Sequence, residues 1–329
     1  MKKLLFFILI PFLGIAQDFT VNNIDYTITS STAPFTARVI SNPNFAGAAV
    51  IPETVAYNSE NYIVTSIQAR AFENCSNLTS VSIPNSVTAI RNSTFENCTN
   101  LTSVTIGNSV ASIGLGAFFQ CNSLTSITIP NSVTSIEISA FGYCTNLTSV
   151  TIPNSVTNIK DRAFQNCTSL TSVTIPSSVT SIGNRAFYDC VALTTVKCYI
   201  TMPLAINADV FGNVTQSNCA LTVPTGTQAV YQAAAVWRNF SPISANLLSN
   251  HSFAIESALK IYPNPVSEIL NIVLQEGLQL EKVNFYNTLG QLIKTTNHSE
   301  INVSSFAKGN YFVEVMTNQG KATKTIIVQ

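Results

Sequence analysis

The chain has 329 residues, which is enough for two domains of ordinary size. Only 10% of the residues are charged, and the 16 Lys and Arg balance the 16 Asp and Glu. A neutral, charge-poor chain lacks the basic surface that binds nucleic acid or an anionic membrane, so both partners are excluded. Ser, Thr and Asn fill the gaps between Ile, Val and Leu, which is a composition typical of β-structure.

The N-terminus predicts a secretory signal peptide over residues 1–16. Lys2 and Lys3 precede an apolar run, and we expect cleavage between Ala16 and Gln17. The alternative is a membrane anchor, but the run is shorter than the roughly 20 residues that span a bilayer, and Pro11 interrupts it. The mature chain is therefore expected to be exported and to have no integral membrane segment.

Before the central repeats, residues 17–47 predict a capping hairpin. The stretches 18–28 and 35–40 alternate as strands do, and Asn22-Asn23 lies near a bend. Residues 50–67 predict a first coil with an insertion. A solenoid with its C-terminal cap is then expected over residues 48–246.

A unit of 23 residues repeats six times in the middle of the chain. It has the pattern A-F-x-x-C-x-x-L-T-S-V-T-I-P-N-S-V-T-x-I-x-x-x, and a fixed period of this length is typical of a solenoid. The L-T-S-V-T-I stretch predicts a strand, and Pro, which cannot donate to a β-ladder, follows it in four copies. Because one unit cannot bury its own apolar edge, the strands should stack as a parallel sheet, with Val87 and Ile90 pointing inward from the far side.

The repeat resembles the BspA-like leucine-rich repeats of bacterial surface proteins. A-F-x-x-C before the strand and I-P-x-S-V-x-x-I after it carry this resemblance over about residues 48–245. The resemblance implies a leucine-rich repeat solenoid in a secreted or cell-surface protein. Several members of the family are implicated in adhesion to host proteins or to other cells.

Six of the eight cysteines keep the period of the repeat. Stacked in register, their Cβ atoms would lie roughly 4.8 Å apart with parallel side chains, whereas disulfides need about 3.5–4.5 Å and converging side chains. We therefore expect buried thiols that donate to nearby carbonyls. A disulfide between Cys198 and Cys219, on adjacent predicted strands, stays open. The six are Cys75, Cys98, Cys121, Cys144, Cys167 and Cys190.

The repeats also predict an exposed sheet face of hydroxyl groups, here named the Thr/Ser face. It serves either as a solvated strand surface or as a ligand-binding surface, since solenoids often bind through such extended sheets. Its members are Thr79, Ser80, Ser82, Thr102, Ser103, Thr105, Thr125, Ser126, Thr128, Thr148, Ser149, Thr151, Thr171, Ser172 and Thr174.

After the repeats, residues 219–224 predict a last strand and residues 227–240 a capping helix with Thr227 as N-cap. Val230, Ala233, Ala234 and Trp237 share one face of that helix. This face is expected to close the open end of the core.

A linker over 247–257 separates the solenoid from a small β-sandwich predicted over 258–329. About seven short alternating stretches, with Gly290 and Gly309 at turns, support the sandwich. This region resembles the type A C-terminal sorting domain of the type IX secretion system of Bacteroidetes. The resemblance implies the type IX machinery as a partner and passage across the outer membrane from the periplasm. The motif residues are Tyr262, Pro263, Asn264, Pro265, Gly290, Gly309, Tyr311 and Lys324.

No catalytic, cofactor or metal motif stands out in the sequence. The two histidines lie in the linker and in the last domain, and no phosphate loop, H-E-x-x-H or G-x-S-x-G is present. We therefore expect no enzyme activity and no cofactor. The leading hypothesis is a secreted or surface recognition protein that binds an extracellular protein or glycan through the Thr/Ser face. A structural surface component without a dedicated ligand is the alternative, and ice binding is a third.

Overall fold

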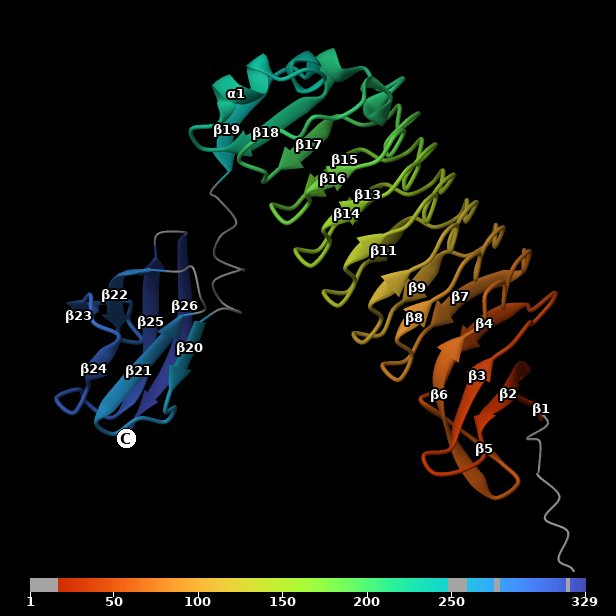
Figure 1. Cartoon of the computed structure of the whole chain (residues 1–329), viewed down its shortest axis with the longest axis horizontal. Helices are drawn as coiled ribbons and strands as arrows, with labels where there is room; N and C mark the ends of the chain where they lie inside the picture. Colours follow the sequence, from red (N-terminus) through yellow and green to blue (C-terminus); the bar gives the residue numbers. More distant parts are fainter. Residues whose placement is uncertain (1–16, 248–258, 275–278, 318–319) are drawn as a thin grey trace, which may run out of the picture.

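The computed structural model describes residues 17–247, 259–274, 279–317 and 320–329. The architecture is mainly β, as the sequence predicts. It has an arc of stacked coils and a set of antiparallel strands over the C-terminal residues (Figure 1). The predicted signal peptide and nearly all of the predicted linker lie outside the described residues, and the domain limits stay predictions.

The solenoid begins with a mixed sheet made of β1 (Asp18–Val21), β2 (Ile24–Ser30), β3 (Thr36–Val39), β6 (Glu60–Ile67) and β5 (Thr54–Tyr57), in that spatial order. β1 and β2 form a hairpin whose turn residues Asn22 and Asn23 have φ of 52° and 62°, as tight two-residue hairpin turns require. β5 and β6 form a second hairpin where the sequence predicts an insertion. Because β6 pairs in parallel with β3, this capping sheet continues past residue 47.

The L-T-S-V-T-I stretches form the predicted parallel strands. Each coil places its strand beside the equivalent residues of the next, so that Ser126 lies opposite Ser149, and Ser149 opposite Ser172. The strands are β7 (Leu78–Ser82), β9 (Ser103–Thr105), β11 (Ser126–Thr128), β13 (Ser149–Thr151), β15 (Ser172–Ile175) and β17 (Thr195–Cys198), with β4 (Gly47–Val50) before them and β18 (Ala220–Pro224) and β19 (Ile243–Leu247) after them.

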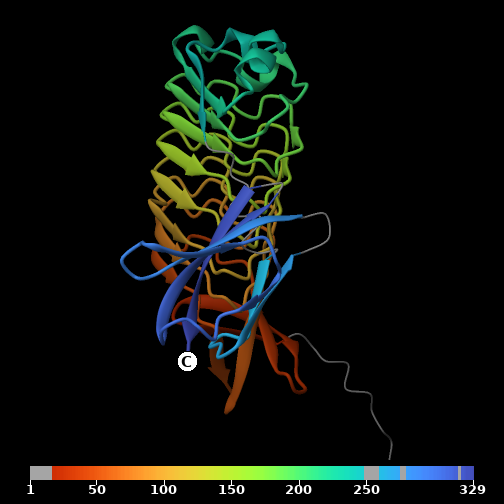
Figure 2. The same cartoon turned by 90° about the vertical axis from the view of Figure 1, so that its left-hand side faces the viewer.

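A second parallel sheet runs along the solenoid, which the sequence does not predict. Val87 and Ile90 are buried, as expected, but Ile90 and its equivalents also pair coil to coil. A turn in which the Val133 amide donates to Pro130 O at 3.1 Å joins the two sheets within a coil. Figure 2 shows the coils stacked along the solenoid. The strands are β8 (Ala89–Ile90), β10 (Ser112–Ile113), β12 (Ser135–Ile136), β14 (Asn158–Ile159) and β16 (Ser181–Ile182).

Stacked phenylalanine rings form the axis of the solenoid core. From Phe72 to Phe187, neighbouring rings have centroids 5.3–5.5 Å apart and planes within 13° of parallel, a spacing within the favourable range for aromatic pairs. The column continues to Phe211, which lies 5.4 Å from Phe187 in the 3-10 turn η1 (Ala208–Phe211). Residues around Phe211 therefore belong to a further coil, although the sequence pattern places them outside the repeats.

The C-terminal cap differs from the single predicted helix. The helix α1 (Gln228–Ala233) ends early, and Val236 has a positive φ of 68° before a separate 3-10 turn, η3 (Trp237–Asn239). The predicted apolar face is therefore wrong for Val230, which is 40% exposed, and confirmed for Trp237, which is fully buried, as is Tyr231. The Trp237 ring packs edge-on to Phe211 and its Nε1 donates to Leu204 O at 2.8 Å, which closes the core.

The N-cap prediction for this helix is half right. Thr227 directly precedes α1, but its hydroxyl donates to Pro224 O at 2.7 Å and caps no helical amide. Another 3-10 turn, η2 (Gln216–Asn218), leads into the predicted last strand β18, and β19 pairs beyond it in parallel.

The C-terminal region forms the predicted β-sandwich, and its described residues contain seven strands. One antiparallel sheet has the order β20-β21-β24 and the other β23-β22-β25-β26, and buried residues from both sheets form a single core. The strands are β20 (Leu259–Tyr262), β21 (Ile269–Leu274), β22 (Leu280–Tyr286), β23 (Leu292–Thr296), β24 (Glu300–Asn302), β25 (Gly309–Thr317) and β26 (Gly320–Val328).

Candidate functional site

The Thr/Ser face consists of three rows of hydroxyl groups that run across the coils. In the first row, three of the five hydroxyls reinforce the solenoid. Thr102, Thr148 and Thr171 each donate from Oγ1 to the carbonyl of the threonine one coil earlier, at 3.0–3.1 Å, and their amides donate to the same carbonyl. These three hydroxyls therefore already have a protein partner.

The second and third rows have free hydroxyls. In the described part of the chain, none of these side chains has a hydrogen-bond partner, and exposure is greatest in the middle coils, from Ser103 to Thr151. Their donors and acceptors point to solvent and are available to a ligand. The residues are Ser80, Ser82, Ser103, Thr105, Ser126, Thr128, Ser149, Thr151, Ser172 and Thr174.

The sheet beneath this face divides between β9 and β11. β4-β7-β9 and β11-β13-β15-β17-β18-β19 are separate sheets. Among the described residues, Thr125 also departs from the repeating pattern, because neither its amide nor its hydroxyl bonds to Thr102 O. The regular ladder is therefore interrupted at one step of the solenoid.

Gly107 lies close to this interruption. It stands where four other coils have Pro, and a Cβ at Gly107 would overlap the backbone of Pro84 in the preceding coil. Because glycine lacks that atom, the turn approaches Pro84 more closely than any other residue allows. This close approach lies at the end of β9, on the β7 side of the sheet division.

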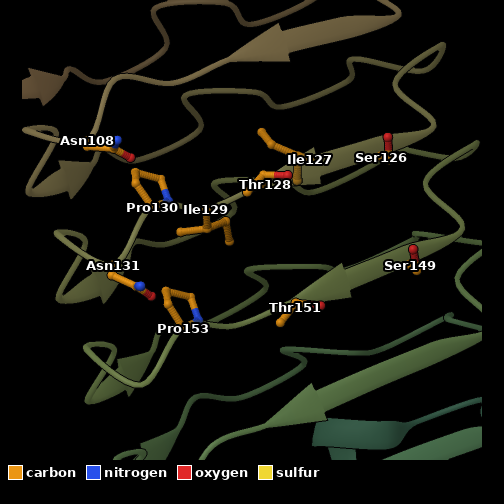
Figure 3. A pocket seen from close by; sticks show the side chains of 10 residues that line it. All are labelled: Asn108, Ser126, Ile127, Thr128, Ile129, Pro130, Asn131, Ser149, Thr151 and Pro153. Atoms are coloured by element: carbon orange, nitrogen blue, oxygen red, sulfur yellow. The ribbon is translucent and has the colours of Figure 1, made fainter. Parts of the chain in front are cut away.

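A groove of about 500 Å³ lies next to this interruption, on the Thr/Ser face over β11 and β13. Ile127, Ile129 and the rings of Pro130 and Pro153 form the apolar floor of the groove, and each of them is largely buried. Figure 3 shows Asn108 and Asn131 together at the turn end of the strands, with Ser126 and Ser149 at the other end. Thr128 and Thr151 lie between them.

The groove lining carries hydroxyl and amide groups and no titratable side chain. The groove therefore offers hydrogen-bonding groups beside apolar ones. The sequence predicts Ser126, Thr128, Ser149 and Thr151 as candidate ligand residues, but it does not predict Asn108 or the proline rings. The available signal was Gly107, which breaks the proline pattern.

The six repeating cysteines form the predicted row of buried thiols. Each Sγ donates to a backbone carbonyl at 3.1–3.2 Å, for example Cys121 to Phe95 O and Cys144 to Phe118 O. Burial raises the pKa of the Cys144 and Cys190 thiols to about 12 and that of Cys121 well above its usual value. The thiols are therefore neutral and inert near pH 7.

Cys198 and Cys219 are free and buried in the structure. They lie on or beside the adjacent strands β17 and β18, as predicted, but the register pairs Thr195 with Ala220. This register places the two cysteines at opposite ends of the strand pair, about 13 Å apart along the strands, whereas a disulfide requires Cα atoms within about 7 Å. The disulfide that the sequence leaves open is therefore not formed.

The predicted sorting residues occupy several parts of the sandwich. Gly290 and Gly309 have positive φ values of 77° and 146° at the turn between β22 and β23 and at the start of β25. Tyr311 is buried and its hydroxyl donates to Ala307 O at 2.9 Å. Tyr262 ends β20 and Lys324 lies in β26. The structure brings the Tyr262–Pro265 segment next to β26, while Gly290 lies in a separate turn.

At the predicted signal cleavage site, Ala16 lies outside the described residues. Gln17 lies just before β1, and its Nε2 donates to the Tyr57 hydroxyl at 2.8 Å. Cleavage before Gln17 stays a prediction.

In the described part of the chain, no helix has the length and apolar character needed to cross a membrane.

Comparison with known proteins identifies two families. The BspA type leucine rich repeat region matches in six copies over residues 24–146 and 65–194, and the secretion system C-terminal sorting domain matches residues 260–329. No curated protein matches this sequence.

Several solved structures are similar to this chain. A leucine rich cell surface protein from Faecalibacterium prausnitzii is 26% identical over 69% of this chain and 72% of its own, with a TM-score of 0.46. A leucine rich repeat protein from T. pallidum is 25% identical over 64% of this chain and 88% of its own, with a TM-score of 0.48.

The two matched families make this a secreted or cell-surface protein. The repeat matches together cover residues 24–194, which is more than half of the chain. The protein therefore belongs to the BspA type leucine rich repeat family and ends in a type IX secretion sorting domain.

Proposed function

We propose that this protein is a recognition or adhesion protein outside the cell and that its Thr/Ser face binds an extracellular glycan or protein. The groove over β11 and β13 is the observation that carries this proposal, because it interrupts an otherwise regular face where the hydroxyls are most exposed. Solenoids present extended surfaces of this kind to large ligands.

The chemistry of the groove favours a neutral glycan chain over a protein. Sugar rings carry hydroxyls on their edges and C–H groups on their faces, which complement the hydroxyls of Thr128 and Thr151 and the apolar surfaces of Pro130 and Pro153. No charged residue lines the groove, so an ionic ligand gains no partner there. The rows on either side extend the same chemistry along several coils, which suits a linear polymer.

The test is binding of the purified protein to immobilised neutral glycans and to extracellular matrix proteins. Thr128→Lys puts a long charged side chain into the groove, and we expect it to weaken binding at least tenfold. Thr134→Lys is the matched control, because Thr134 is an exposed threonine that does not line the groove. Equal binding by both variants would show that the ligand does not use this face.

Two other functions predict different results in the same experiments. A structural surface component binds neither the immobilised glycans nor the matrix proteins, and Thr128→Lys does not change that result. Ice binding would use the in-register hydroxyl rows as a regular surface for water. It predicts that the wild type shows thermal hysteresis and that Thr128→Lys shows less. Thermal hysteresis without glycan or protein binding would replace the proposed function.

A further inference from the structure

The terminal strand β26 lies at an edge of its sheet, and its last residues are nevertheless covered. Four outward backbone groups at the end of the strand are bonded by residues 264–266. Asn264 Oδ1 accepts from the Ile327 amide at 2.8 Å, and Asn264 Nδ2 donates to Thr325 O at 3.1 Å. The Val266 amide donates to Ile327 O at 2.8 Å, and the Gln329 amide donates to Val266 O at 2.9 Å. We name these contacts the Asn264 clasp.

The side chain of Asn264 takes the place of a peptide group in a neighbouring strand. A primary amide carries a donor and an acceptor in one plane, as a peptide unit does. Outward backbone groups of a strand recur every second residue, and Thr325 and Ile327 have that separation. The parallel bridge between Val266 and Val328 then continues the pairing. Aspartate lacks the donor and alanine lacks both groups, so neither residue can make both bonds.

The clasp connects parts of the chain that are far apart in sequence. Asn264 follows β20 of one sheet, whereas β26 belongs to the other sheet, so the clasp ties the two sheets together at their margin. It also joins the beginning and the end of the matched sorting domain, which spans residues 260–329. Only the folded domain presents these two ends as one surface.

The surface beside the clasp is exposed. Ile327 and Phe312 are 42% and 41% exposed, and Phe312 lies opposite Thr325 in the β25–β26 pair. An unpaired edge strand is free to shift or to pair with another chain, so the orientation of the Ile327 side chain depends on what holds the edge, whereas Phe312 lies on the inner strand β25.

We propose that Asn264 is a positioning residue for export, and that its side-chain amide holds the terminal strand in the one geometry that the secretion machinery recognises. The clasp protects the end of β26 from pairing with other chains in the periplasm and fixes the outer side chains of this strand. The inference rests on the sorting domain and is independent of the ligand proposed for the solenoid.

The test compares strand protection with export for the full-length chain. Asn264→Ala removes both side-chain bonds, and Asn264→Asp keeps the acceptor for Ile327 but loses the donor to Thr325. Asn297→Asp adds the same charge at an exposed residue of the sandwich outside the clasp. Val313→Ala makes a cavity in the core of the domain and lowers its stability without touching the clasp.

Hydrogen exchange is measured on protein made in a host without the secretion system, and cell fractionation is measured in the native host. We expect amides 325–329 to exchange at least tenfold faster in Asn264→Ala, while β21 keeps its protection. The surface and medium fraction should fall at least fivefold, with protein retained in the periplasm. Asn264→Asp should show the same changes to a smaller extent, and Asn297→Asp should match the wild type.

Three results would overturn the proposal. One is wild-type export of Asn264→Ala despite faster exchange at the terminal strand. Another is loss of protection throughout the sandwich in both Asn264 variants, which would make the residue a fold stabiliser only. The third is an export defect in Val313→Ala as large as that in Asn264→Ala, with the two variants equal in thermal stability. The stability of the domain would then be enough to explain the loss of export.

Discussion

At the scale of single residues, the repeating cysteine illustrates why a small inward side chain with a weak donor suits this position. Cys121 and its equivalents are fully buried, and each thiol supplies a bond to a backbone carbonyl of the coil before it. A larger side chain would not fit beside the Phe column, and alanine would leave that carbonyl with one partner fewer.

The first prediction compares Cys121 with Leu124 in the same coil. Leu124→Ala should lower the free energy of unfolding by about 2–5 kcal/mol, because Leu124 is fully buried and its truncation leaves a cavity. Cys121→Ser should cost less than half as much, since the serine hydroxyl still donates to Phe95 O. Urea unfolding of both variants measures the difference, and a serine variant as unstable as the alanine variant would contradict it.

At the scale of the structural element, the thiol row makes the solenoid sensitive to alkali. Burial raises the pKa of the Cys144 and Cys190 thiols from 9.0 to about 12 and that of Cys198 to about 11. Unfolded thiols lose their protons near pH 9, whereas folded ones keep them. The unfolded state therefore binds fewer protons above pH 9, and the stability that is fully present below pH 9 falls as the pH rises toward 12.

The second prediction is a loss of about 1.4 kcal/mol per pH unit for each such thiol above pH 9. Urea midpoints at pH 8, 9.5 and 10.5, measured under reducing conditions, give the slope for the wild type. Cys144→Ala has one thiol fewer. Its stability should therefore fall less steeply with pH, by about 1.4 kcal/mol per pH unit, which corresponds to one proton. An identical slope in this variant would mean that Cys144 ionises equally in both states.

The sheet division is a second consequence at this scale. Gly107 replaces the proline of four other coils, and the missing Cβ lets its turn lie against the backbone of Pro84. The groove over β11 and β13 lies next to this departure from the repeat.

At the scale of the whole molecule, the solenoid and the sandwich have separate buried cores. Coils of a solenoid contact their neighbours and their caps, so stability is nearly a sum over adjacent units. Trp237 and Phe240 close the end of the solenoid core against Phe211, before the sandwich begins. The solenoid therefore needs no residue of the sandwich to complete its core.

The third prediction follows from this separation. A chain truncated after Asn250 should keep the thermal stability of its solenoid, because the cap remains complete, but it should accumulate in the periplasm for lack of the sorting domain. Circular dichroism melting and cell fractionation measure the two effects. Efficient delivery of the truncated chain to the surface would remove the sorting role from the C-terminal domain.

Local pattern accounts for most of the solenoid and for much of the candidate site. The 23-residue period predicts the stacked parallel strands, the inward Phe and Leu, the neutral Cys row and the outward Thr/Ser rows, because side-chain direction in a strand depends on neighbouring residues. It does not show that three hydroxyls of the first row, those of Thr102, Thr148 and Thr171, donate to the solenoid backbone. The coil around Phe211 does not keep the 23-residue period, so the pattern does not predict it, although the Phe211 ring stacks on Phe187 in the phenylalanine column.

The sequence by itself determined the repeat, the buried and exposed positions and the sorting motif. Only the tertiary structure decided where the sheet divides, which hydroxyls stay free, why Cys198 and Cys219 remain unpaired, and what Asn264 contacts. Each of these depends on register or approach between segments far apart in the chain, such as Asn264 and Ile327. Periodicity specifies which way a side chain points, whereas its partner depends on how separate segments pack against one another.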